Sequence, residues 1–263
     1  TTELKKGSFI TAIIRQVCAL LSYFIPTRII CVATASMNKH VSLGYARKKM
    51  LVIGNGFELE HLQFDNLKRE TLRAKYNIDE NNIVIGSLGR FSEDKGQEIF
   101  LKSAKILNLR NTNIHFLIIG KGINKDNEQL ISWINDANLG KNITVLEEQS
   151  DILACLSAMD IFCLHSRTEG FPNVLGEAMA VGLPCVATNV GDVKHLLSDT
   201  GVIVDKNNPL ALVEGLELLI NNSIEQNKSL GSKARMRIEQ EFTINQTRKK
   251  FDAVYTSLLN GEV

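Results

Sequence analysis

The sequence predicts an α/β protein built on a doubly wound parallel sheet. Two observations predict it: short apolar runs alternate with helical patterns from residue 83 onward, and 263 residues with 44% apolar side chains and 4 prolines suit a folded chain. Such alternation gives a parallel sheet covered by helices on both faces. The expected strands are Ile83–Leu88, Ile114–Ile119, Ile143–Leu146, Ile161–Leu164, Pro184–Ala187 and Val202–Val204. The expected helices are Gly96–Asn108, Asn127–Ala137, Ile152–Met159, Pro172–Val181 and Pro209–Asn221.

The N-terminal segment precedes this pattern. Apolar residues recur at helical spacing over Phe9–Ile25, and we expect this helix to pack on the core; the alternative is a helix that lies on a membrane surface. It is shorter than the roughly 20 apolar residues that a bilayer span needs. Strand-like runs at Ile29–Ala33 and Met50–Ile53 flank a helix expected at Met37–Tyr45. The sequence opens without Met or a secretion-signal pattern, so we expect it to begin inside a longer protein.

Charge and cysteine content limit the function. Because 30 Lys and Arg face 29 Asp and Glu, bulk charge does not favour nucleic acid as a partner. The five cysteines are odd in number, stand far apart and form no C-x-x-C pair, so we interpret them as reduced thiols of a cytosolic protein without a zinc site.

Ligands of doubly wound sheets bind beyond the carboxyl ends of the strands, so the loops that follow the strands are informative. The loop Gly89–Gly96 follows the first strand and carries Arg90 and Lys95 between glycines. Arginine can fork onto phosphate oxygens and lysine adds a mobile charge. No phosphate-binding loop of the Walker type and no dinucleotide fingerprint is present, and a solvated turn explains this loop alone equally well. A second loop, at Gly120-Lys121-Gly122, is by itself more typical of a tight turn.

The loop at residues 166–173 and the helix after it are the strongest signal. Pro172 stands where a helix begins, so the turn Gly170–Asn173 aims free backbone N–H groups at the cleft. Glu169 precedes this turn and Glu177 lies in the helix. Carboxylates accept sugar hydroxyls, and cations neutralise phosphates. A nucleotide sugar, with its diphosphate between two polyols, would satisfy both sets of groups.

With these residues the chain resembles the retaining glycosyltransferases of family 4, whose GT-B architecture consists of two facing Rossmann-like domains. The resemblance covers residues 28–258 and is densest over Leu164–Val204. The motifs that carry it are Gly54-Asn55-Gly56-Phe57, Leu88-Gly89-Arg90 with Lys95-Gly96, Ile119-Gly120, Ser150-Asp151, Glu169-Gly170-Phe171-Pro172-Asn173 with Glu177-Ala178-Met179, Gly182-Leu183-Pro184, Gly191-Asp192 and Asp199-Thr200-Gly201.

The resemblance implies roles for individual residues. Arg90 and Lys95 would act on the donor diphosphate, Glu177 would bind the ribose, and Glu169 would face the transferred sugar, which makes Arg90, Lys95 and Glu169 the expected catalytic residues. The expected donor-contacting residues are Gly89, Gly120, Gly170, Phe171, Pro172, Asn173, Val174 and Glu177. The base would lie near Gly120 and Leu146–Ile152, although Glu147 replaces a glycine common in the family. The family uses no metal and no cofactor, and we expect none here.

The resemblance also implies a domain organisation. Residues 1–55 would be a remnant of the acceptor-side N-terminal domain, residues 56–240 the Rossmann-like donor domain, and residues 241–263 a helix that packs back toward the N-terminal segment. Open apolar faces in residues 1–53 would lead to self-association or to pairing with a missing N-terminal domain.

The expected function is therefore transfer of a sugar from a UDP-, GDP- or ADP-sugar, with retention, to a saccharide or lipid-linked acceptor at the cytoplasmic face of the membrane. Two alternatives stay open: a non-catalytic donor-binding subunit of a split transferase, and an isomerase or hydrolase of nucleotide sugars.

Overall fold

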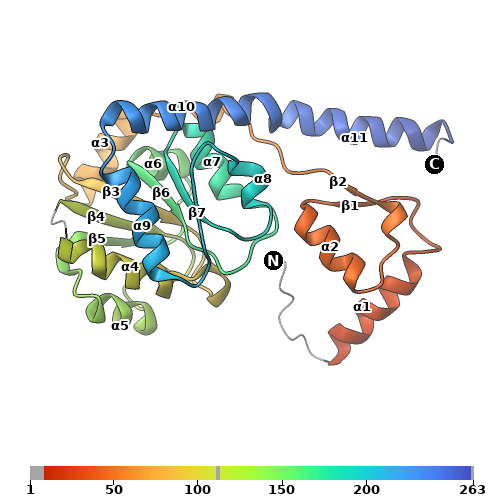
Figure 1. The fold of residues 1–263 in the computed structure, drawn as a ribbon, viewed down its shortest axis with the longest axis horizontal. Helices are drawn as coiled ribbons and strands as arrows, with labels where there is room; N and C mark the ends of the chain where they lie inside the picture. Colours follow the sequence, from red (N-terminus) through yellow and green to blue (C-terminus); the bar gives the residue numbers. More distant parts are fainter. Residues whose placement is uncertain (1–8, 111–112, 262–263) are drawn as a thin grey trace.

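The computed structural model describes residues 9–110 and 113–261 and contains a six-stranded parallel sheet (Figure 1). The strand order is β5-β4-β3-β6-β7-β8, and Ile85 of β3 pairs with Phe116 on one side and with Ile161 on the other. The predicted doubly wound α/β fold is confirmed. The strands are β3 Ile83–Leu88, β4 Ile114–Ile119, β5 Ile143–Leu146, β6 Ile161–Leu164, β7 Cys185–Thr188 and β8 Val202–Val204.

Helices cover both faces of this sheet, which explains why the strands are almost uniformly apolar. On one face Ile85, Phe116 and Cys163 pack under α4, α5 and α9, and on the other Val84 and Phe162 pack under the remaining helices. The first set is α4 Gln97–Arg110, α5 Glu128–Asp136 and α9 Pro209–Ile220. The second set is α3 Asn66–Lys75, α6 Ile152–Ser157, α7 Asn173–Val181, α8 Val193–Leu197 and α10 Ile224–Glu241. Short 3₁₀ turns lie at Arg47–Lys49, Leu59–His61, Glu93–Lys95 and Gly140–Asn142.

A small N-terminal unit lies beside the six-stranded sheet (Figure 1). It consists of α1 Phe9–Leu21, β1 Ile29–Cys31, α2 Thr34–Ser42 and β2 Met50–Val52. The strands β1 and β2 pair in parallel, and Cys31, Met37 and Met50 form a core of their own. This second, much smaller core can bury only part of the apolar surface of the unit.

The expectation that the first helix packs on the core is wrong for most of its apolar surface. Ile14 is 55% exposed, Leu20 64% and Phe24 77%, whereas Ala19 and Ser22 are buried. The two strands and one helix that accompany α1 offer too little surface to cover it. Within residues 9–110 and 113–261, no helix combines the length and apolarity that a bilayer crossing requires.

The C-terminal part of the chain returns to the junction between the two units. Phe57 donates its N–H to the carbonyl of Phe242 at 2.8 Å, and Ile244 donates to the carbonyl of Phe57 at 3.0 Å. The final helix, α11 Ile244–Leu259, then extends over the N-terminal unit without a buried residue (Figure 1). The Thr247 hydroxyl bonds to the Gly54 carbonyl at 3.2 Å. The predicted division into residues 1–55, 56–240 and 241–263 stays a prediction.

Candidate functional site

The candidate site lies where the order of the strands reverses. Starting from the central pair β3 and β6, the chain adds β4 and β5 on one side and β7 and β8 on the other. In open α/β sheets the loops at the carboxyl ends of such a central pair diverge and leave a crevice for a ligand. Here the loop after β3 contains Arg90 and Lys95, and the loop after β6 contains Glu169.

Lys95 and Glu169, two predicted site residues 74 positions apart, are brought into direct contact. The Lys95 ammonium lies 2.6 Å from Oε1 of Glu169, with side-chain exposures of 19% and 9%. The Ser166 hydroxyl donates to the same carboxylate oxygen at 2.6 Å. Because both charges are largely removed from water, each depends on the other for compensation.

His165 fixes the backbone at Lys95. Its Nδ1 lies 2.7 Å from the Lys95 carbonyl, and its Nε2 lies 2.7 Å from the Ser87 hydroxyl of β3. Burial lowers the pKa of His165 to about 4, so the ring is neutral at physiological pH. Since a carbonyl only accepts, we assign the proton to Nδ1, which leaves Nε2 to accept from Ser87. His165 is therefore a structural residue beside the site.

Arg90 has a different environment from Lys95. Its side chain is exposed and forms no ion pair with any residue that the structure describes. The neighbouring glycines make close backbone contact: Gly120 has φ 153°, and a Cβ there would lie 2.2 Å from the Gly89 carbonyl oxygen. Both predicted glycine positions, Gly89 and Gly120, thus belong to one tightly packed pair of loops in which a side chain at Gly120 would not fit.

The start of α7 offers free backbone donors. The helix begins at Asn173, one residue later than predicted, with Pro172 as its N-cap. Across the described chain, the N–H groups of Asn173 and Val174 find no acceptor. Unpaired N–H groups and the helix dipole make this end favourable for an anion.

The side chains beside the first residues of α7 are engaged in contacts with other parts of the protein. The Phe171 ring packs between those of Phe57 and Phe242, with centroids 6.3 and 6.2 Å away, so only the backbone of Phe171 is available to a ligand. Oδ1 of Asn173 accepts from Asn55 at 2.7 Å.

Glu177 is a half-buried carboxylate without a partner. It lies on α7, and no described residue donates a hydrogen bond to it or pairs with its charge. Burial raises the pKa of this carboxyl above its ordinary value. A desolvated acceptor of this kind would be satisfied by the hydroxyl groups of a bound ligand.

Glu147 connects the loops after β4 and β5. It accepts from the Gly122 N–H at 2.7 Å and from the Asn124 side chain at 2.5 Å, and these bonds lower its pKa. The predicted base-binding segment Leu146–Ile152 borders a cavity of about 330 Å³ to which it contributes Gln149 and Asp151.

Sequence reasoning missed the contact between α2 and this site. Asp192 accepts from the N–H groups of Thr34 at 2.7 Å and Ala35 at 2.9 Å, so its carboxylate caps the start of α2. A Cβ on Gly170 would meet the Ser36 hydroxyl at 3.1 Å. The Gly191-Asp192 motif was a signal, but its partners lie about 158 positions away in the chain. Among the residues that the structure describes, no group of three or more His, Cys, Asp or Glu could hold a metal ion.

The comparison with protein families is decisive at this point. Residues 68–237 match the model of the glycosyl transferases group 1. The chain belongs to this family. The matched range includes both loops of the candidate site and the whole of α7.

Individual relatives are consistent with the family. The chain is 30% identical over 247 residues to the capsular polysaccharide biosynthesis glycosyltransferase CapM of Staphylococcus aureus, which covers 91% of this chain and 64% of CapM. It is 26% identical to the Escherichia coli UDP-Gal:alpha-D-GlcNAc-diphosphoundecaprenol alpha-1,3-galactosyltransferase, over 89% of this chain and 61% of the relative. The chain thus spans less than two thirds of these relatives.

Solved structures confirm the fold. HepE of Anabaena in complex with UDP-glucose superposes with a TM-score of 0.86 at 21% identity, over 97% of this chain and 70% of HepE. The C-terminal domain of a Francisella tularensis group 1 glycosyl transferase gives a TM-score of 0.62 at 21% identity, over 72% of this chain and all of that domain. At this identity the likeness shows a shared GT-B fold and does not by itself assign a ligand.

Proposed function

We propose that this chain binds a nucleoside-diphosphate sugar and serves as the donor-binding part of a retaining glycosyltransferase. The observation that carries the proposal is the half-buried, unpartnered carboxylate of Glu177 on α7, the helix whose first N–H groups are also free. An acceptor for hydroxyls and donors for an anion on one helix fit a ribose joined to a diphosphate.

In this proposal the protein stabilises the charge that develops on the departing phosphate. Arg90 and Lys95 follow β3, and the unpaired N–H groups of Asn173 and Val174 at the start of α7 would act on the same phosphates. One cation at about 4 Å from a phosphate charge contributes about 4 kcal/mol at an effective dielectric constant near 20. Such groups lower the barrier because they are positioned before the reaction starts.

Glu169 would accept hydroxyl groups of the transferred sugar. Its Oε1 receives Lys95 and Ser166 in the structure, which leaves Oε2 without a described donor. When the diphosphate binds, Lys95 gains a second anionic neighbour while Glu169 stays beside it. This arrangement would place the anomeric carbon between the acid and the departing phosphate, and the acceptor would attack on the face that the phosphate leaves.

The relatives support the donor class and leave the sugar open. HepE was solved with UDP and with UDP-glucose, and the Escherichia coli relative is named for UDP-galactose. We therefore place UDP-sugars first, before GDP- and ADP-sugars. CapM is named for capsular polysaccharide biosynthesis, which supports a saccharide or lipid-linked acceptor.

A donor-binding subunit that needs a separate acceptor-side chain is the second candidate. The exposed apolar face of α1 favours it, because that surface is suited to cover by another folded unit. Both candidates predict that this chain binds a nucleotide. They differ in one result: only the subunit candidate predicts that sugar transfer starts when a separate acceptor-side chain is added.

The proposal is tested by thermal unfolding with UDP, GDP, ADP and UDP-glucose. A ligand at 100 times its dissociation constant adds about 2.7 kcal/mol to stability, so a binding nucleotide raises Tm clearly. Arg90→Ala should remove most of this rise, while Arg110→Ala, which breaks an exposed pair with Glu217 at the far end of α4, should keep it. A folded wild-type chain whose Tm responds to none of the four ligands would refute the proposal.

A further inference from the structure

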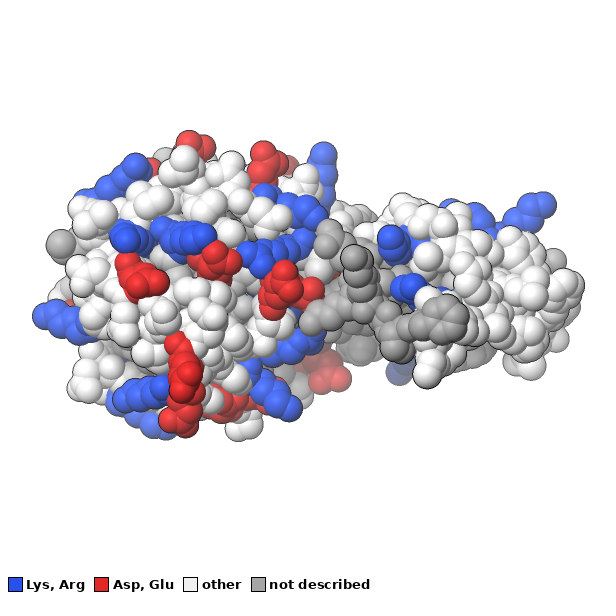
Figure 2. Space-filling view, turned by 90° about the horizontal axis from the view of Figure 1, so that it is seen from below, with Lys and Arg blue, Asp and Glu red and all other residues white. Residues whose placement is uncertain are grey.

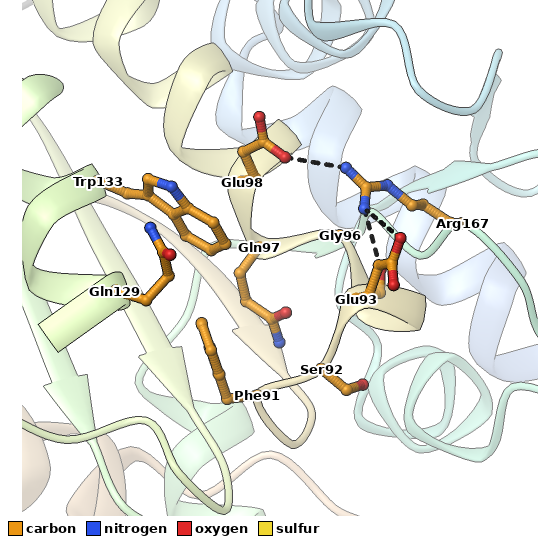
Figure 3. Close-up of a pocket in the computed structure, with 9 residues that line it drawn as sticks. All are labelled: Phe91, Ser92, Glu93, Gly96, Gln97, Glu98, Gln129, Trp133 and Arg167. Carbon is orange, nitrogen blue, oxygen red and sulfur yellow. Dashed lines mark hydrogen bonds and ion pairs between the residues drawn. The ribbon is translucent and has the colours of Figure 1, made fainter. Parts of the chain in front are cut away.

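A cavity of about 360 Å³ lies next to the candidate site, and none of the predicted site residues lines it. It opens over the start of α4, between Trp133 of α5 and Arg167 of the loop after β6 (Figure 3). Its volume is at the lower end of the roughly 300–1,000 Å³ found for small-molecule sites. The loop Gly89–Gly96 separates the two regions, with Arg90 and Lys95 in the donor site and Phe91 in the cavity wall.

One wall of the cavity is aromatic. The rings of Phe91 and Trp133 lie 5.6 Å apart between centroids, inclined by 42°, and both are half-buried (Figure 3). Two rings in this arrangement provide an angled apolar wall, in which each ring face can pack against a ligand. They favour a ligand with an apolar face of its own.

Polar groups without partners surround the aromatic wall. Gln97 is 3% exposed and donates its amide to the Arg90 carbonyl at 2.9 Å, but its own Oε1 receives no hydrogen bond from the described residues. The indole N–H of Trp133 and the amide of Gln129 likewise form none within the described chain. The cavity thus offers both donors and acceptors.

The charges at the opposite wall are already compensated. Arg167 donates to Glu98 at 3.0 Å and lies 3.9 Å from Glu93 (Figure 3). Glu98 also pairs with Lys102 at 2.5 Å. An ionic ligand would compete with these pairs, because each charge already has a partner of opposite sign. A neutral ligand can bind beside them without this competition.

We propose that this cavity binds a neutral saccharide. A pyranose ring presents an apolar face to Trp133 and Phe91 and carries hydroxyl groups that both donate and accept, which matches Gln97 and Gln129. That the saccharide belongs to the glycan under assembly rests on the proposed function; saccharide binding itself does not.

Trp133 allows a direct test because it is the one tryptophan in the sequence. Maltose, cellobiose and diacetylchitobiose are titrated to about 10 mM while tryptophan emission is recorded, a range that reaches dissociation constants near 1 mM. We expect at least one disaccharide to change the emission with saturation. Glycerol at the same concentration should leave it unchanged, and an equal response to glycerol would show an additive effect and refute the proposal.

Two variants assign the binding to the cavity. Gln129→Ala should weaken it about 2- to 10-fold, the worth of one or two neutral hydrogen bonds, and Gln240→Ala, another exposed glutamine on a helix, should not. Trp133→Ala, followed by calorimetry, should abolish the heat of binding. Affinity that is unchanged in both Gln129→Ala and Trp133→Ala would place the saccharide elsewhere.

The outcome is distinguishable from that of the proposed function. If UDP raises Tm but no disaccharide changes the emission or gives heat, the cavity proposal fails and donor binding stands. If disaccharides bind and no nucleotide does, the proposed function fails and the cavity proposal stands. Binding of glucuronate in preference to glucose would show that the cavity selects an anion and would overturn the choice of a neutral ligand.

Discussion

Arg90 and Lys95 share one loop but differ in what surrounds them. Arg90 is exposed and unpaired within the described chain, whereas Lys95 contacts a nearly buried glutamate. The same substitution therefore has different consequences at the two positions. At Arg90 it removes only a charge that is available to a ligand, and at Lys95 it also leaves Glu169 uncompensated.

Arg90→Ala should weaken UDP binding about 10- to 100-fold, the worth of a charged hydrogen bond, and change the free energy of unfolding by less than about 0.5 kcal/mol. Lys95→Ala should also destabilise the chain by about 1–3 kcal/mol, because a buried acid loses its partner. Calorimetry with UDP and urea unfolding measure the two effects. In Lys95→Ala combined with Glu169→Gln, most of the lost stability should return; an additive loss would contradict the pair.

Replacement of Glu177 should raise the stability of the chain but weaken its binding of UDP. Its pKa is raised in the folded chain, so the protein is relatively more stable below the ordinary value of 4.5 and loses that stability as pH rises through the folded pKa. Glu177→Gln should therefore raise Tm of the ligand-free chain at neutral pH and leave it nearly unchanged near pH 4.

The same variant should lower affinity for UDP about 10-fold, since an amide is a weaker acceptor for ribose hydroxyls than a carboxylate. Glu214→Gln, on α9 away from the crevice, is the matched control. Unchanged UDP affinity in Glu177→Gln would show that Glu177 does not contact the ribose.

At the scale of elements, the start of α2 is held by a residue from the unit that contains the six-stranded sheet. The N-cap of α2 is Ala33, which has no side-chain oxygen to offer, and Asp192 supplies the missing acceptors. Helices commonly satisfy their first N–H groups locally. Here the cap also joins the N-terminal unit to the turn at Gly170, because Asp192 donates its own N–H to the Gly170 carbonyl at 2.9 Å.

Asp192→Ala should cost about 0.5–2 kcal/mol, the usual effect of losing a helix cap. Hydrogen exchange should accelerate at the N–H groups of Thr34 and Ala35 and leave the central strands β3 and β6 protected. Asp199→Ala, an exposed aspartate after α8, should do neither. Unaltered exchange at Thr34 in Asp192→Ala would mean that the carboxylate does not hold α2.

For the whole molecule, the near-neutral net charge conceals a marked asymmetry. Residues 9–57 contain six Lys or Arg and no Asp or Glu, and the face seen in Figure 2 shows only basic charges over the N-terminal unit. The unit that contains the six-stranded sheet carries the acidic excess. The N-terminal unit also exposes the apolar face of α1, so this end of the molecule has the surface most suited to association.

The chain should therefore self-associate through α1 when it is alone. Sedimentation velocity over a concentration series should show a rising average mass for the wild type. Ile14→Lys with Leu20→Lys should abolish the rise, because charges on both positions oppose burial of that face. Leu218→Lys, at a leucine of α9 that is 60% exposed, should not. A wild type that is monomeric at every concentration would contradict the prediction.

The periodicity of the sequence by itself determined the six-stranded sheet, because strands buried on both faces must be apolar throughout, as Ile83–Leu88 and Ile114–Ile119 are. It did not reveal α3 or α8. In α3 only Leu72 and Arg73 are buried, and its polar sequence gives no apolar stripe to recognise.

Residue type and spacing also identified the loops of the candidate site, since a helix start and paired charges are local features. Tertiary structure alone decided that Lys95 lies against Glu169, that Asp192 caps α2 and that α1 remains exposed. These outcomes depend on contacts between segments 74 to 158 residues apart, or on the amount of surface that neighbouring elements can cover. Neither the contacts between distant segments nor the surface that neighbouring elements can cover is encoded in a local pattern of residues.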